Sequence, residues 1–325
     1  MNDTTSNATP AQVYKNLAFS GGGVKGIAYG GVLQVLEDHE ILQGVERVAG
    51  TSAGAIVATA LAVGFKAEEV TDLLKNTSFK DFMDAPHSLI GKIWGLVFNY
   101  GWCKGHAFEK WIIDKVIYKK TKNRDLTFAD LKKLSENEDG FRELSMIATN
   151  LHAQSSVIFS ADKTPNVRIA EAVRTSMSIP FFFQSIRQGQ DVYVDGGVAF
   201  NYPIELYDTI RRAPADEGGN TREPNPETLG FRLCPHDAIA YQEKMESVPR
   251  KVNNAIAFCE SIIFFLMDQA NMSHLSTKDE KRTVFIDTAD IGTTDFDITP
   301  AQIELLIKNG KEAMEKYLKE NPAGK

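Results

Sequence analysis

Short apolar runs alternate along this chain with stretches whose apolar residues recur at helical spacing. Residues 15–20 and 45–49 predict two buried strands, and residues 32–36 carry the helical pattern between them. Further strand-like runs follow at 191–194 and 229–233. Strands that alternate with helices favour parallel pairing, so the pattern predicts an α/β fold whose central, mainly parallel sheet is covered by helices on both faces.

The segments around this pattern predict one domain with a tail and a loop. Residues 14–325 are interpreted as a single domain, because no repeat or linker divides them. Residues 1–13 are polar and rich in Thr, Ser and Asn, which predicts a disordered N-terminal arm. Residues 212–227 combine Pro, Gly, Asn and charged residues and predict an exposed loop.

A helix is expected at the C-terminal end, over residues 299–320. Thr299 as N-cap, Pro300 at the first helical position and Gln302 three residues after the cap form a capping-box pattern before an apolar stripe. The pair at 309–310, Asn-Gly, predicts a break or kink in this helix.

A G-x-S-x-G pentapeptide directly follows the second predicted strand and opens a helix of small residues. It consists of Gly50-Thr51-Ser52-Ala53-Gly54. In this context the pentapeptide is typical of a sharp strand-to-helix turn that exposes a nucleophilic serine. Free N–H groups at the start of the helix would favour the negative charge that develops when the serine attacks an ester.

A glycine cluster follows the first predicted strand and reads Gly21-Gly22-Gly23-Val24-Lys25-Gly26. It also fits G-x-G-x-x-G, but the acidic residue that would bind a ribose is not at the end of the next strand. A phosphate-binding loop is excluded as well, because the cluster lacks its Gly-Lys-Ser/Thr ending. In one β-α-β unit the two strand ends converge, so the N–H groups of Gly22 and Gly23 are expected to form an oxyanion hole over Ser52.

A candidate base stands at the end of the strand 191–194. Asp195 is followed by Gly196 and Gly197, and then by Asn201-Tyr202-Pro203. An isolated Asp-Gly is often a turn, but here it accompanies two matching motifs.

Together the three motifs resemble, in order and in sequence, those of the patatin-like phospholipase or acylhydrolase family. The likeness covers roughly residues 15–210, includes residues 176–183, and is weaker around 294–296. Lys25 stands where arginine is commoner in the family, which keeps the charge but loses the fork geometry. The resemblance implies a three-layer patatin-like fold and a dyad in which Asp195 takes the proton of Ser52, an acyl-enzyme forms, and water releases a fatty acid.

The resemblance leaves other readings open. A Ser-Asp-His esterase would use a histidine after Asp195, which leaves His236 and His274 as candidates. An acyltransferase would differ only in the group that receives the acyl chain. A lipid-binding module without catalysis would tolerate the loss of Ser52.

Composition narrows the class of protein. The 325 residues are 43% hydrophobic and carry a net charge of −7, and no nucleic-acid reader motif is present, so nucleic-acid binding is disfavoured. No cofactor is implied, and six histidines and three cysteines show no zinc-like spacing, so no metal is expected. Scattered cysteines and the lack of a signal-peptide pattern predict a cytoplasmic protein, or one exported without a cleavable signal.

Membrane phospholipid is the expected substrate, with the protein peripheral at membranes when active. Residues 89–98, with Tyr100 and Trp102, are apolar and aromatic and are a candidate lid or acyl tunnel, and 262–267 is a second apolar run. Residues 104–133 hold nine Lys or Arg against four acids, a surplus that could orient the chain on an anionic membrane. Whether a protein or small-molecule activator is needed is left open.

Overall fold

The computed structural model describes residues 13–84, 99–211, 221–234, 261–262, 265 and 276–322. The predicted N-terminal arm up to residue 12, the apolar segment 89–98, and both His236 and His274 lie outside the described residues. Of the second apolar run, Ile262 and Phe265 are described, and both are exposed rather than part of the core.

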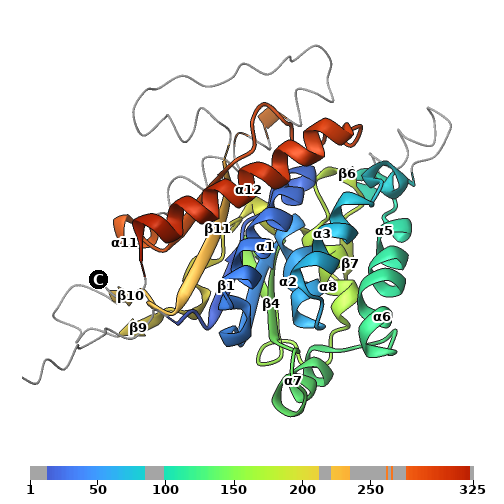
Figure 1. The fold of residues 1–325 in the computed structure, drawn as a ribbon. Helices are drawn as coiled ribbons and strands as arrows, with labels where there is room; N and C mark the ends of the chain where they lie inside the picture. The colour runs from blue at the N-terminus through green and yellow to red at the C-terminus, as the bar shows by residue number, and fades with distance from the viewer. Residues whose placement is uncertain are drawn as a thin grey trace, which may run out of the picture.

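Eight strands form the main sheet of the described chain (Figure 1). Its parallel part has the order β12-β11-β1-β2-β4, and β8 and β7 continue it in antiparallel orientation, while β5 pairs with β4. The strand bounds are β1 (Asn16–Phe19), β2 (Arg47–Thr51), β4 (Glu143–Asn150), β5 (Ser155–Ser160), β7 (Ile186–Gln188), β8 (Asp191–Asp195), β11 (Thr228–Cys234) and β12 (Thr283–Asp287). The predicted mainly parallel α/β sheet is confirmed.

Helices pack against the sheet and one another around a large apolar core. Figure 1 shows α12 crossing over α1, and α2 directly follows β2. The longer helices are α1 (Tyr29–Asp38), α2 (Ala53–Ala62), α3 (Ala67–Lys75), α7 (Phe128–Asn137), α8 (Ile169–Ser176) and α12 (Pro300–Glu320). Shorter ones are η1 (Gly23–Ala28), η2 (Ile41–Gly44), η3 (Phe79–Phe82), α5 (His106–Trp111), η4 (Ile112–Ile117), α6 (Tyr118–Thr121), η5 (Gly196–Val198), η6 (Ile204–Tyr207) and α11 (Thr277–Glu280).

The period of two along β1 divides its side chains between the two faces of the sheet. Leu17 and Phe19 join the large core. Ala18 points to the opposite face, where it packs with Tyr202 and Ile204 at the start of η6. The segment that follows Asp195 therefore returns across the sheet and covers β1 from its second face.

The C-terminal helix α12 begins at Pro300 as predicted, with the Thr299 side chain accepting a hydrogen bond from the Gln302 N–H. The predicted break at 309–310 is wrong, because the helix runs unbroken to Glu320. Gly310 has a different role: a methyl group there would overlap the Ala28 carbonyl oxygen. The glycine thus permits a close crossing between α12 and the segment that leads into α1.

Part of the expected loop 212–227 is a strand. β10 (Thr221–Glu223) pairs antiparallel with β9 (Thr209–Arg211). Its central residue, Arg222, forms ion pairs with Asp208 and Asp279, whose side chains are fully buried. Long-range ionic contacts of this kind leave no local sequence pattern, which explains why the strand was not predicted.

Candidate active site

Ser52 occupies a strained turn between β2 and α2. Its backbone has φ 52° and ψ −123°, a conformation that non-glycine residues adopt only where the surroundings impose it. A methyl group at Gly50 would overlap the Gly54 carbonyl, and one at Gly54 would overlap the carbonyl oxygen of Phe19 at the end of β1. The two glycines of the pentapeptide therefore let the turn pack tightly against the strand and the helix beside it.

Asp195 is brought to the same point by the pairing of β4. One edge of β4 is occupied by β5 from Ser145 to Asn150, so β2 and β8 share its other edge. On that edge Thr51 pairs in parallel with Ile147, and Asp195 pairs antiparallel with Ala148. β2 and β8 thus run toward each other, and their C-terminal ends meet where Ser52 and Asp195 lie.

The Asp195 carboxyl group is fully buried. Its Oδ1 accepts a hydrogen bond of 2.7 Å from the Gly197 N–H, while Oδ2 has no hydrogen-bond partner among the described residues. Burial raises the pKa of Asp195 to about 7, and the Ser52 hydroxyl and the Gly197 N–H oppose this rise. Gly196 is needed because a methyl group there would overlap the Ile147 carbonyl oxygen.

Helix α8 ends against the serine. The Ser52 N–H donates to the Ser176 Oγ at 2.9 Å, and the Ser52 Oγ–H points at the Met177 Sδ at 3.5 Å. In this arrangement the hydroxyl points at Met177, yet it is close enough to the Asp195 carboxyl to act against the rise of that group's pKa. Sequence analysis placed both Ser176 and Met177 in the family-like stretch 176–183 but assigned them no contact with the serine.

The glycine loop lies beside Ser52. An ideal Cβ on Gly21 would be 3.1 Å from the Ser52 Cβ. The Gly21 N–H donates to the Asn201 carbonyl at 3.1 Å, and the Val24 N–H donates to the Thr293 carbonyl at 3.2 Å. Among the described residues, the N–H groups of Gly22 and Gly23 have no acceptor.

The remaining motif residues are packed around these groups. Val24 and Lys25 are buried, and a methyl group at Gly26 would lie 2.9 Å from the Ala53 Cβ. The Thr51 Oγ1 donates to the Phe200 carbonyl at 3.2 Å, which ties the turn to the segment after Asp195. The structure therefore brings together all three motifs: Gly21 to Gly26, Gly50 to Gly54 and Asp195 to Gly197.

Thr293 contacts the glycine loop through its backbone, and no sequence motif predicted this contact. Its carbonyl oxygen faces Gly23, whose φ is +59°. Gly23 therefore combines a left-handed conformation with the absence of a side chain that would overlap Thr293. The signal in the sequence was the weak likeness around 294–296, one residue further along.

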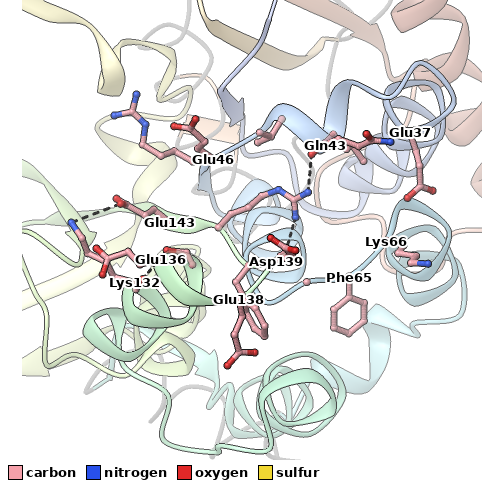
Figure 2. Close-up of a pocket in the computed structure, with 18 of the residues that line it drawn as sticks. Glu37, Gln43, Glu46, Phe65, Lys66, Lys132, Glu136, Glu138, Asp139 and Glu143 are labelled. Atoms are coloured by element: carbon pink, nitrogen blue, oxygen red, sulfur yellow. Dashed lines mark hydrogen bonds and ion pairs between the residues drawn. The ribbon is translucent and has the colours of Figure 1, made fainter.

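A concave region lies at the end of the sheet where β2 and β4 begin (Figure 2). This cavity of about 1190 Å³ opens where β2 and β4 begin, beside Arg47 and Glu143. Its acidic side chains are Glu37, Glu40, Glu46, Glu136, Glu138, Asp139, Glu143 and Asp162. Because strands β2 and β4 run away from it, the cavity lies at the other end of the sheet from Ser52.

Acidic side chains pair with part of the basic stretch that the sequence suggests as a membrane contact. In the basic stretch 104–133, Lys110 and Arg124 both pair with Asp114, and Lys120 pairs with Glu69, so part of its charge is compensated locally. No helix among the described residues is both long enough and apolar enough to cross a bilayer.

The fold and these motifs define an α/β protein with a serine turn, a glycine loop and a buried aspartate at one end of its sheet. The model of the patatin-like phospholipase family matches residues 17–208, more than half of the chain. The chain therefore belongs to the patatin-like phospholipase family, and this membership supports lipid hydrolase activity.

Individual proteins are similar to this chain in sequence or in structure. The uncharacterized protein YqhO of Bacillus subtilis is 31% identical over 95% of this chain and 99% of its own length. The probable lipid hydrolase 463L of invertebrate iridescent virus 6 is 26% identical over 59% of this chain and 63% of its own. VipD from Legionella pneumophila has a similar structure, with a TM-score of 0.60 and 19% identity over 98% of this chain and 69% of that chain.

Proposed function

We propose that this protein is a serine acylhydrolase of the phospholipase A or lysophospholipase type. In this proposal it cleaves fatty-acyl esters of membrane glycerophospholipids through a Ser52–Asp195 dyad. The observation that carries the proposal is that the C-terminal ends of β2 and β8 meet on one edge of β4. This meeting supports a site in which the strained Ser52 lies beside the buried carboxyl group of Asp195.

In the first half-reaction Asp195 acts as the general base. Its Oδ2 takes the proton of the Ser52 hydroxyl, while the Ser52 Oγ attacks the ester carbonyl carbon. For this step the hydroxyl must turn from Met177 toward the carboxyl group, a rotation about one side-chain bond. An aspartate of ordinary pKa is a weak base at neutral pH, so the rise to about 7 supports this role.

Negative charge then develops on the former carbonyl oxygen. The N–H groups of Gly22 and Gly23 are the donors we assign to it, because the neighbouring N–H groups of Gly21 and Val24 are already bonded to carbonyl oxygens. The proton on Asp195 passes to the departing alcohol, which leaves an acyl-enzyme on Ser52. Water, activated by the same carboxylate, then releases the fatty acid.

We further propose that the chain acts as a peripheral protein at the membrane surface. Lipid is then its main binding partner. Transfer of the acyl group to another alcohol would use the same acyl-enzyme.

The proposal is tested by incubating the wild type and Ser52→Ala with mixed phospholipid vesicles and measuring free fatty acid and lysolipid by mass spectrometry. Release by the wild type alone is expected, and the lysolipids formed identify the headgroup and the ester position. Equal release by Ser52→Ala would refute the dyad. Labelling by an alkyl fluorophosphonate provides a second readout that does not depend on the vesicle composition. This labelling should occur in the wild type and be absent in Ser52→Ala.

A further inference from the structure

We infer that Asn201 is a catalytic residue of the deacylation step, in which its side-chain oxygen and Asp195 together hold the water that attacks the acyl-enzyme. This inference rests on the proposed function. It goes beyond that function because it assigns the second proton of the attacking water to a particular group and thereby links Asn201 to hydrolysis rather than acyl transfer.

Two buried acceptors without partners lie near Ser52. Among the described residues, both the Asp195 Oδ2 and the Asn201 Oδ1 are buried and make no hydrogen bond. Asn201 is 8% exposed, so its amide is largely removed from bulk water. Buried acceptors nearly always have a partner, because an unpaired one costs about 1–3 kcal/mol. Two of them beside one nucleophile indicate a small donor that enters during the reaction.

The position of the Asn201 oxygen follows from its contacts with the glycine loop. An ideal Cβ on Gly21 would overlap the Asn201 Oδ1 and lie 3.1 Å from the Ser52 Cβ, so the amide oxygen and the serine side chain border the same space. Only glycine at position 21 leaves this space free.

The orientation of the amide is fixed by its other end. The Asn201 Nδ2 donates to the Gly21 carbonyl oxygen at 3.4 Å. Exchanging Oδ1 and Nδ2 would place the Asn201 oxygen against the Gly21 carbonyl oxygen. The Asn201 Oδ1 is therefore assigned to the side toward Ser52. The backbone carbonyl of Asn201 also accepts the Gly21 N–H, which holds the residue in register with the loop.

The chemistry of the two acceptors matches what a hydrolytic water needs. Water attacks the acyl carbon through its oxygen and gives one proton to the Asp195 Oδ2. Its second hydrogen stays on the oxygen and is held by the Asn201 Oδ1, which accepts but cannot take up a proton. When the tetrahedral intermediate collapses, the Ser52 Oγ leaves and receives the proton from Asp195. The products are the free fatty acid and the restored serine.

The test separates acylation from deacylation with p-nitrophenyl butyrate as the probe. Asn201→Ala is expected to release one equivalent of p-nitrophenol per protein in a burst, followed by a steady phase about 10- to 100-fold slower than that of the wild type. Intact-protein mass spectrometry should show the variant carrying one butyryl group that requires Ser52.

Asn150→Ala is the matched control. Asn150 is also buried, but its Nδ2 donates to the Asp191 Oδ1 and its Oδ1 accepts the His152 and Ala153 N–H groups, so every end of its amide is occupied within the protein. Its replacement should lower stability without accumulation of butyryl-enzyme. Asn201→Ser, which is smaller but polar, is used for the same measurement if the alanine variant does not fold.

A role for Asn201 in loop structure alone would slow acylation and deacylation together and leave no butyryl-enzyme, and this result would overturn the inference. It would leave the proposed function intact if the wild type still turns over the probe through Ser52. A wild type that neither hydrolyses the probe nor becomes acylated would instead overturn the proposed function and this inference with it.

Discussion

Replacing Asp195, the proposed base, by its neutral isostere asparagine should make the protein more stable at high pH while it removes activity. Asp195 has a pKa of about 7 in the folded chain because it is buried, whereas its ordinary value is 3.8. The folded state therefore binds this proton more tightly than the unfolded state does. The stabilising contribution is fully present below the ordinary pKa and is lost as the pH rises through about 7.

The size of the effect follows from these two pKa values. Each pKa unit is worth ~1.36 kcal/mol, so the fully ionised carboxylate costs the folded state about 4 kcal/mol. Between pH 5 and pH 8 the wild type should lose about 2.5 kcal/mol of unfolding free energy through ionisation of Asp195, and Asp195→Asn should lose none of this contribution. Comparing two pH values removes any constant effect of the amide itself.

Urea unfolding of both proteins at pH 5 and pH 8 measures this difference directly. Asp191→Asn is the matched control: it removes one carboxylate from the same strand at a partly exposed position, where the side chain has hydrogen-bond donors from Asn150 and Tyr193. Parallel pH profiles for the wild type and Asp195→Asn would refute the account of Asp195 as a carboxylate destabilised by burial. The same pKa predicts that kcat/KM falls about tenfold for each pH unit below 7.

Three further predictions concern the loop, the helix crossing and the ionic cluster. Gly22→Ala should lower kcat by about 10- to 1000-fold in the vesicle assay, because the added methyl group overlaps the Leu233 side chain and displaces the proposed oxyanion donor; an unchanged rate would remove that role. Gly310→Ala should lower the melting temperature, since the methyl group overlaps the Ala28 carbonyl. In an exposed helix the same change would instead stabilise the protein by ~1 kcal/mol, so a raised melting temperature would contradict the close crossing. Arg222→Ala removes a partner of buried Asp279, whose pKa the guanidinium lowers, and should cost about 1.5–3 kcal/mol of unfolding free energy in urea at pH 7. This loss of stability should shrink below about pH 4, and a loss that stays constant with pH would argue against ion pairing.

The sequence by itself determined the elements that carry the motifs. A run of apolar residues before each glycine-rich turn was sufficient to predict strands ending at residues 19 and 51 to within a residue or two. The cap at Thr299 predicted the start of α12, since capping depends on neighbours in the chain. These features share one physical cause: each is decided by interactions within about ten residues.

Only the tertiary structure decided which groups meet around the serine. That Asp195 reaches Ser52 depends on β5 occupying one edge of β4, so that β2 and β8 must share the other, and no local pattern encodes this choice. The same is true of Asn201 and Thr293, which contact the glycine loop from segments far along the chain. The raised pKa of Asp195 likewise comes from burial, which is a property of the assembled fold and not of an Asp-Gly-Gly sequence.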